Sequence, residues 1–141
     1  MKAERKPSVL VCVTGQYDCD RLIEAGFELA VEKGWELHVL SVRPPVSDLG
    51  SASDEIEHLY RTAKDLGADM TLTFAVSAPH SAADFARRTN ARLVVTGMPD
   101  SRPNGFVLTL HEIMPKLRMI TVTKDNEYLM YGIEQDQRIF A

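Results

Sequence analysis

The chain has 141 residues and a mass of 15.8 kDa, which is the size of one globular domain that can bury a core without metal or disulfide links. Lys and Arg number 16 against 20 Asp and Glu, and the resulting net charge of −4 argues against a nonspecific nucleic-acid-binding module. Apolar residues make up 45% and charged residues 26%, a composition typical of a folded rather than a disordered chain.

The start of the chain and its two cysteines indicate the compartment. No apolar run approaches the roughly 20 residues that cross a bilayer, and Val9–Val13 is too short for a signal peptide and fits a first strand better. Cys12 lies inside that run and Cys19 beyond a turn, so we expect neither a structural disulfide nor a metal site. We therefore expect a soluble, cytoplasmic protein with reduced thiols and no membrane or nucleic-acid partner.

Short apolar runs alternate along the chain with segments of helical periodicity, a pattern typical of βαβ units around a parallel sheet. The expected strands are Ser8–Thr14, Glu36–Val42, Met70–Val76, Arg92–Gly97 and Arg118–Thr123. The first and fourth are nearly continuous in apolar and β-branched residues, as in strands covered on both faces, whereas the third and fifth alternate more, as in edge strands. Right-handed crossovers then predict one α/β domain with five parallel strands and helices on both faces.

Four helices are expected, one in each connection between the strands. The first is capped by Asp18 or Asp20 and ends at Gly34, and Gly26 within it permits a close approach to the sheet. The buried stripe of the second helix is expected to consist of Ile56, Leu59, Tyr60, Ala63 and Leu66. The fourth helix, over Phe106–Met114, is short because Pro115 interrupts it.

Residues 125–141 do not follow this alternation, yet they are rich in large apolar side chains. These are Tyr128, Leu129, Met130, Tyr131, Ile133, Ile139 and Phe140. Because so apolar a segment does not suit a solvated tail, we expect it to pack on the surface of this domain or on a second subunit. The predicted organisation is a domain over residues 1–124 followed by an apolar C-terminal tail over residues 125–141.

Two loops follow the carboxyl ends of the first and fourth strands, where open parallel sheets bind their ligands. The candidate binding residues in these loops are Thr14, Gly15, Gly97, Met98, Asp100 and Gly105. Glycine allows positive φ and a close approach of the backbone, and N–H groups at the start of a helix can hold an anion. The same composition is also that of an ordinary surface turn, so composition alone leaves both interpretations open.

The chain resembles a universal stress protein domain over about residues 7–124, through the segments VLVCVTG, DRLIEAGFELAVEKG, ELHVLSVRPP and ARLVVTGMPD in this order. The run VLVCVTGQYDCDRLI is also similar to the universal-stress-like region of potassium-responsive sensor kinases. The resemblance implies a Rossmann-like three-layer α/β/α domain with a five-stranded parallel sheet of order 3-2-1-4-5. It also implies a homodimer formed through the fifth strand, to which we expect the apolar tail to contribute, and a role in stress response or signalling.

Many members of that family bind ATP or AMP through an acidic residue after the first strand and a Gly-x2-Gly-x9-Gly-Ser/Thr pattern after the fourth. Here Gly97 matches the first glycine, Asp100 replaces the second and Thr14 stands at the acidic position. A shortened loop would bring Gly105 to the third glycine, and Val42 would contribute backbone beside an adenine. The resemblance thus implies an adenine-nucleotide cleft with an incomplete motif, in which a carboxylate at Asp100 would repel phosphates.

No group of residues in the sequence predicts catalysis or metal binding. The four histidines are not spaced as metal ligands, and neither a Gly-x-Ser-x-Gly elbow nor a Walker glycine–lysine loop is present. The stretch from Thr14 to Cys19 resembles the Ser-Gly-Gly-x-Asp-Ser loop of ATP pyrophosphatases, with Gln16 in place of the second glycine. We therefore expect a non-catalytic regulatory domain, the alternatives being a nucleotide-cleaving enzyme of that type and a dimerisation module without a ligand.

Overall fold

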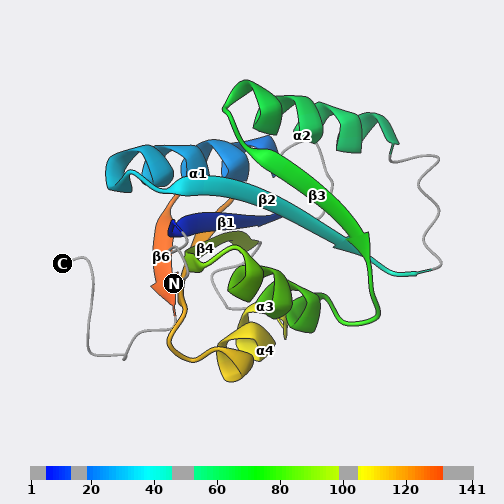
Figure 1. Ribbon diagram of the computed structural model, residues 1–141, viewed down its shortest axis with the longest axis vertical. Coiled ribbons are helices and arrows are strands. Elements are labelled where there is room, and N and C mark those ends of the chain that lie inside the picture. Colours follow the sequence, from blue (N-terminus) through cyan, green and yellow to red (C-terminus); the bar gives the residue numbers. More distant parts are fainter. Residues whose placement is uncertain (1–5, 14–18, 46–52, 99–104, 132–141) are drawn as a thin grey trace, which may run out of the picture.

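A six-stranded sheet with helices on both faces forms the body of the molecule (Figure 1). The computed structural model describes residues 6–13, 19–45, 53–98 and 105–131. In chain order the elements are β1 (Ser8–Val13), α1 (Asp20–Lys33), β2 (Glu36–Arg43), α2 (Ser53–Asp65), β3 (Asp69–Phe74), α3 (Ala78–Arg88), β4 (Ala91–Met98), α4 (Gly105–Ile113), β5 (Arg118–Thr123) and β6 (Tyr128–Tyr131).

The strand order is β3-β2-β1-β4-β5-β6, and the first five strands in this order are parallel to their neighbours. The predicted three-layer α/β/α architecture and the order 3-2-1-4-5 are therefore confirmed. A sixth strand, which the sequence did not predict, pairs antiparallel with β5. The expectation that the fifth strand is an edge is wrong, because β4 and β6 flank it on its two sides.

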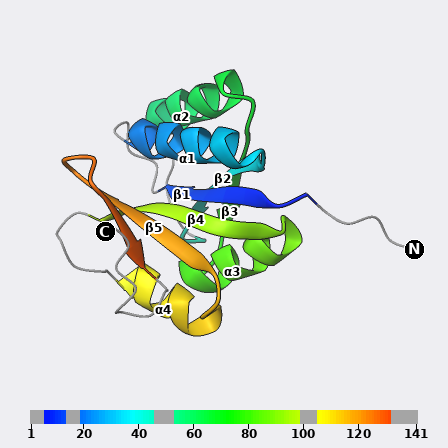
Figure 2. The same ribbon diagram turned by 90° about the vertical axis from the view of Figure 1, so that its left-hand side faces the viewer.

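Two apolar cores separate the sheet from its helices. Helices α1 and α2 cover one face and α3 and α4 the other, as Figure 2 shows with the sheet between the two pairs. Successive residues of a strand point to opposite faces, so Val9 and Val11 of β1 join the core under α1 while Leu10 and Cys12 join the core above α3 and α4. This double burial explains why β1 is a continuous apolar run.

Helix α1 lies close to the sheet and ends as predicted. A Cβ atom added at Gly26 would overlap with Cγ2 of Val11, so only glycine fits at this contact between helix and sheet. Gly34 has a φ of 71°, and the amide of Trp35 donates to the carbonyl of Ala30 over 2.9 Å, which closes the helix in a left-handed turn. The predicted role of Asp20 as the cap is wrong, because the N-cap is Cys19 and Asp20 is already inside the helix.

Helix α2 buries a narrower stripe than its periodicity suggests. Leu59 and Ala63 are fully buried, but Tyr60 is 51% exposed, so its predicted place in the core is wrong. Tyr60 stands at the margin of the apolar stripe, where a long side chain can turn its ring toward solvent. Within the described ranges, no helix is long and apolar enough to cross a membrane.

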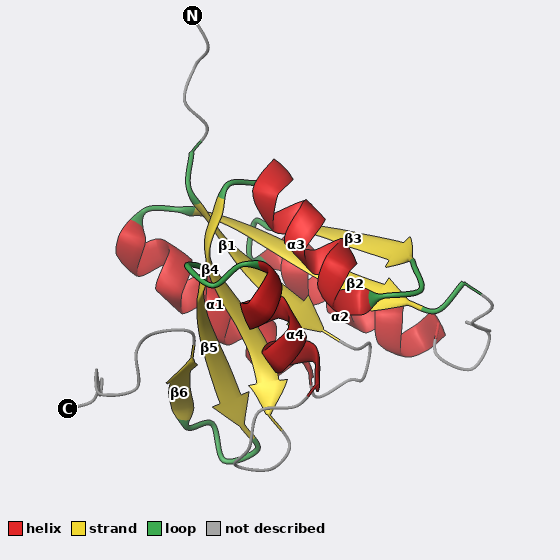
Figure 3. Cartoon of the chain, turned by 90° about the horizontal axis from the view of Figure 1, so that it is seen from below, coloured by secondary structure: helices red, strands yellow, loops and turns green. Residues whose placement is uncertain are grey.

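A tight hairpin joins β5 to β6 at the side of the sheet away from β3 (Figure 3). The amide of Thr123 donates to the carbonyl of Glu127, and the amide of Asn126 donates to the carbonyl of Thr123, both over 2.9 Å. Asn126 takes a φ of 63°, which a three-residue hairpin loop requires at its last position. Pairing of a second subunit with the backbone of β5, as the resemblance implied, is therefore blocked by β6.

Candidate functional site

The candidate site lies at the carboxyl ends of β1 and β4, next to the starts of α1 and α4. Strand order changes direction here, since the chain moves from β1 outward to β3 and then returns to β4 on the other side of β1. Of the predicted site residues, Thr14, Gly15 and Asp100 lie outside the described residues. The structure describes Val42, Gly97, Met98 and Gly105. We call the described residues at this edge of the sheet the rim of the site.

The sheet register brings these rim residues onto two different faces. Val13 of β1 pairs with Ser41 of β2, and Val11 pairs with Val95 of β4, so continuing the second register by two residues places Gly97 beside Val13. Ser41, Val13 and Gly97 thus form one row across three strands. Val42, one residue further along β2, packs into the opposite core beside α3 and α4. Gly97 and Val42 are therefore two strands apart and face opposite sides of the sheet.

Gly97 and Gly105, the two described glycines of the rim, leave space where a side chain would stand, and neither has a positive φ. Within the described ranges a positive φ at glycine occurs only at Gly34 and Gly67, so neither Gly97 nor Gly105 uses the left-handed conformation that glycine allows. A Cβ atom at Gly97 would stand 3.5 Å from Cδ1 of Leu22, an ordinary contact, and at Gly105 it would meet nothing within 4 Å. Gly105 is the exposed first residue of α4.

One guanidinium stands at the start of α1. The N-cap residue of this helix is Cys19, whose side chain makes no capping hydrogen bond. Arg21, in the first turn, donates from Nη1 to the carbonyl oxygen of Thr123 over 3.0 Å and so holds its guanidinium at this edge of the sheet. A helix N-terminus and a guanidinium together favour an anion. The sequence did not reveal Arg21 as a site residue, because Thr123 is 102 positions away.

A carboxylate on the same turn is already engaged. Oδ2 of Asp20 lies 3.1 Å from Nε2 of His58 on α2, with both side chains partly exposed. This pair joins the first turn of α1 to the middle of α2.

Ser41 is a second rim residue that the sequence did not reveal. Its side chain is fully buried, and in the described part of the chain its Oγ atom has no hydrogen-bond partner. An unpaired buried hydroxyl is destabilising by about 1–3 kcal/mol, and such groups are commonly satisfied by a ligand or a bound water. A serine within an apolar strand carries no pattern that would single it out.

The two cysteines are structural residues. Cys12 and Cys19 are both buried and both are free thiols. Cys19 packs with Leu22 and Ile23 in the core under α1. Burial raises the pKa of the Cys12 thiol from 9.0 to about 12, which keeps it protonated and unreactive at neutral pH. Where the structure is described, no three His, Cys, Asp or Glu residues gather as a metal site would require.

No family model and no curated protein matches the sequence. Solved structures do match. A universal stress protein from Archaeoglobus fulgidus has a TM-score of 0.61 at 18% identity, over 82% of this chain and 92% of that chain. The chain has the universal stress protein fold.

Two further universal stress protein structures match to the same degree and contain nucleotides. One, from Archaeoglobus fulgidus in complex with dAMP, has a TM-score of 0.61 at 20% identity over 81% of this chain and 95% of that chain. The other, in complex with cAMP, has a TM-score of 0.59 at 20% identity over 85% of this chain and 98% of that chain. At these identities the likeness establishes the universal stress fold, and it confirms at that level the resemblance drawn from the four sequence segments.

Proposed function

We propose that this chain is a cytoplasmic regulatory domain of the universal stress type that binds an adenine nucleotide at the carboxyl edge of β1 and β4. The residues proposed to border the nucleotide remain Thr14, Gly15, Val42, Gly97, Met98, Asp100 and Gly105, to which Arg21 is added. The observation that carries the proposal is the Arg21 guanidinium, which is fixed beside the start of α1 at this edge of the sheet. That two similar structures hold dAMP and cAMP at this fold supports an adenine nucleotide as the ligand.

The proposed ligand is a nucleoside monophosphate, AMP or a cyclic form, rather than ATP. One helix N-terminus and one guanidinium suit a single phosphate, which carries far less charge than a triphosphate. The glycine motif that the resemblance implies is incomplete, since Asp100 replaces its second glycine, and a carboxylate at this motif position would repel further phosphates. Nucleotide occupancy would then change the affinity of the domain for a partner and so convey a signal.

Thermal unfolding in the presence of AMP, cAMP or ATP tests this proposal, because a ligand that binds only the native state stabilises it. At a ligand concentration tenfold above Kd the native state gains about 1.4 kcal/mol, a shift of roughly 3–6 °C for a chain of this length. We expect AMP and cAMP to raise the melting temperature, and ATP and GMP to raise it by a smaller amount. No shift with any nucleotide would contradict the proposal and favour the module without a ligand.

Two arginine variants test whether the nucleotide binds beside the start of α1. Arg21→Gln keeps a side-chain N–H for the Thr123 carbonyl but removes the charge, so we expect weaker AMP binding with little loss of stability. Arg92→Gln is the matched control, since Arg92 is exposed at the opposite, amino edge of the sheet. Equal AMP affinity in both variants would place the nucleotide elsewhere. Release of inorganic phosphate from ATP would favour the alternative of a nucleotide-cleaving enzyme.

We also propose a homodimer, formed through β6 instead of β5. In the described sheet β6 has a neighbour on one side only, and its four residues, Tyr128–Tyr131, include no charge that would discourage pairing. Light scattering at tens of micromolar should give twice the mass of the chain. Leu129→Lys, which places a charge on this strand where Leu129 is 38% exposed, should give the monomer. A monomeric wild-type protein would contradict the proposal.

A further inference from the structure

Strand β3 lies at the side of the described sheet opposite to β6, and it pairs with β2 only (Figure 3). We call the side of β3 that faces away from β2 its open edge. Natural proteins commonly protect such an edge with a lysine, a proline or a bulge. β3 has none of these, since its only charge is Asp69 at the first position and its register with β2 runs without a shift. The strand is therefore able to pair with a further strand.

The backbone of β3 directs three residues toward the open edge. The amide of Ala75 donates to the carbonyl of Arg43 over 2.9 Å, so the backbone groups of Ala75 point toward β2. The N–H and C=O groups of successive residues point alternately to the two sides of a strand. Those of Met70, Leu72 and Phe74 therefore point away from β2, where the described sheet has no neighbouring strand.

The same three residues carry the apolar side chains of β3. Met70 packs against the core that lies between the sheet and helices α1 and α2. Because side chains alternate between the two faces, Leu72 and Phe74 also lie on the α2 face, while Thr71 and Thr73 lie on the opposite face. Phe74 is 46% exposed, so the apolar row is not covered at its carboxyl end.

Helix α2 adds an aromatic side chain to this surface. The helix lies along β3 and beside α1 (Figure 1). His58 contacts Asp20 of α1, and Leu59 is fully buried in the core against the sheet. Each helical residue is rotated by about 100° from the one before it, so Tyr60 lies on the side of α2 away from α1, next to the open edge of β3. Tyr60 is 51% exposed.

We propose that the open edge of β3 pairs antiparallel with the open edge of a second copy of this chain, about a two-fold axis at Leu72. In this register Leu72 lies opposite Leu72 of the second copy, and Met70 lies opposite Phe74 of the second copy. Each of these pairs consists of residues that point outward, so each exchanges both of its backbone hydrogen bonds. The two sheets then form one continuous sheet with α2 of both copies on the same face.

The side chains of β3 are complementary to those of a second copy in this register. Apolar residues lie opposite apolar residues on the α2 face, and Thr71 lies opposite Thr73 on the other face. Both kinds of pair stabilise antiparallel strands. Asp69, the only charge of the strand, lies opposite Ala75 and so has no like charge across from it.

The charges of α2 are complementary about the same axis. Glu57 and Lys64, three residues before and four after Tyr60, lie on the same side of the helix. Tyr60 is about 8 Å from the end of α2, and Leu72 is about 10 Å from the start of β3, so both lie at nearly the same level. The axis at Leu72 therefore brings Glu57, which also pairs with Arg61 over 3.0 Å, toward Lys64 of the second copy. This charge complementarity favours a second copy as the occupant of the edge.

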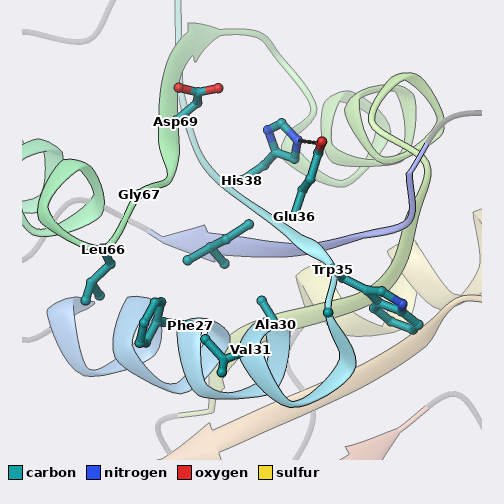
Figure 4. Close-up of a pocket in the computed structure, with 11 residues that line it drawn as sticks. Phe27, Ala30, Val31, Trp35, Glu36, His38, Leu66, Gly67 and Asp69 are labelled. Atoms are coloured by element: carbon teal, nitrogen blue, oxygen red, sulfur yellow. Dashed lines mark ion pairs between the residues drawn. The ribbon is translucent and has the colours of Figure 1, made fainter.

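A pocket at the start of β3 is not part of this surface. Its volume is about 430 Å³, and Figure 4 shows it where α1 leads into β2 and α2 leads into β3. The carboxylates of Glu36 and Asp69 lie on the α3 face of the sheet, whereas Phe27, Val31 and Leu66 lie on the α1 and α2 face. The lining residues therefore do not form one binding site.

The variant Leu129→Lys provides the background for the test, because it blocks the proposed pairing through β6. The β6 interface is expected to include the apolar tail, so pairing through β3 should be the weaker of the two and should appear at hundreds rather than tens of micromolar. We expect the mass of Leu129→Lys protein in sedimentation velocity to rise from one chain toward two over this range. A mass that stays at one chain would overturn this proposal and leave the nucleotide site and the β6 dimer untouched.

Substitutions in this background locate the interface. Phe74→Lys places a charge at the open edge and should abolish the association. Val31→Lys is the matched control and should leave it unchanged, since Val31 is an equally apolar residue, 63% exposed, on α1. Glu57→Lys should weaken association about threefold or more, and Glu57→Lys combined with Lys64→Glu should restore it. Association that survives Phe74→Lys, or that falls equally in Val31→Lys, would overturn the proposal.

Amide hydrogen exchange identifies the strand that pairs. The amides of Met70, Leu72 and Phe74 should exchange more slowly in concentrated than in dilute Leu129→Lys protein, because association gives each a carbonyl partner. The amide of Thr73 points toward β2 and should change less. Unchanged exchange at the three outward amides in protein that does associate would show that the copies meet elsewhere and would overturn the proposal.

Discussion

Nη1 of Arg21 donates a 3.0 Å hydrogen bond to the carbonyl oxygen of Thr123, which links the first turn of α1 to the last residue of β5. Between these two elements lies the end of β4, where the proposed nucleotide site begins. The same carbonyl accepts from the amide of Asn126 in the hairpin to β6. One acceptor thus connects a helix start, a strand end and a turn at the edge of the sheet where binding is proposed.

Removing the Arg21 side chain should destabilise the protein, because it removes a hydrogen bond between α1 and β5. Arg21→Ala is expected to lower the free energy of unfolding by about 1 kcal/mol, less than a fully unpaired carbonyl would imply, because Thr123 keeps the Asn126 amide as a partner. Urea denaturation measures the change. Arg92→Ala, which removes an exposed arginine from the amino edge, should change stability by less than about 0.5 kcal/mol. Equal effects of the two substitutions would show that the contact contributes nothing.

The approach of α1 to the sheet depends on a glycine. Gly26→Ala places a Cβ atom against Cγ2 of Val11, a fully buried side chain, and should lower the free energy of unfolding by about 2–3 kcal/mol. Gly105→Ala, where the added Cβ meets nothing within 4 Å, should be close to neutral. Adding Val11→Ala to Gly26→Ala removes the clash, so the double variant should lose less than the sum of the two single losses. Strict additivity in chemical denaturation would contradict the packing explanation.

The sequence predicts the parallel core of this fold because β1 and β4 are buried on both faces and therefore read as unbroken apolar runs. The sequence does not predict β6, and the reason lies in the residues of the strand and its turn. The strand has only four residues, and the turn before it, Lys124–Asn126, contains no glycine, the residue that commonly indicates a hairpin turn. The position of β6 is also the reason that we propose the dimer through β6, since a strand that covers β5 takes over the free edge on this side of the described sheet.

The sequence predicts the binding site less well than the fold, because a site depends on residues that the fold brings together from distant positions in the chain. The family resemblance implies that Gly97 and Val42 border one cleft, but the one-residue offset in register turns them to opposite faces of the sheet. Arg21 and Thr123 are adjacent only in the folded chain. The pairing of Asp69 with His38 likewise depends on the late start of β3, which propensity does not resolve.

The hairpin that holds β6 should respond to the backbone of Asn126. Asn126→Gly keeps the φ of 63° without strain, whereas Asn126→Val forces a β-branched residue into the left-handed region and should be destabilising by about 1–2 kcal/mol. Amide hydrogen exchange over residues 127–131 should accelerate in the valine variant and not in the glycine variant. Lys124→Val, at a loop position without positive φ, is the control. Unchanged protection in Asn126→Val would show that β6 is held by side-chain packing alone.

The buried thiol of Cys12 should make stability fall at alkaline pH. Its pKa is raised from 9.0 to about 12 in the folded state, so above pH 9 the unfolded chain releases a proton that the native state retains. Stability is therefore fully present below pH 9 and decreases as the pH rises toward 12, with a loss from this group of about 1.4 kcal/mol between pH 8 and 10. Burial and Glu28 also raise the pKa of Tyr128, but its effect begins only near its unfolded value of 10.0.

Urea denaturation of wild-type protein and Cys12→Ala at pH 8, 9 and 10 isolates this contribution, because every other titrating group is common to both. The variant is less stable at pH 8, since a buried sulfur is lost, but its stability should decline less with pH. Val11→Ala truncates a neighbouring buried residue that does not titrate and should keep the wild-type decline. Parallel curves for wild type and Cys12→Ala would mean that the thiol reaches solvent in the native state, which a position between β2 and β4 under α3 and α4 does not allow.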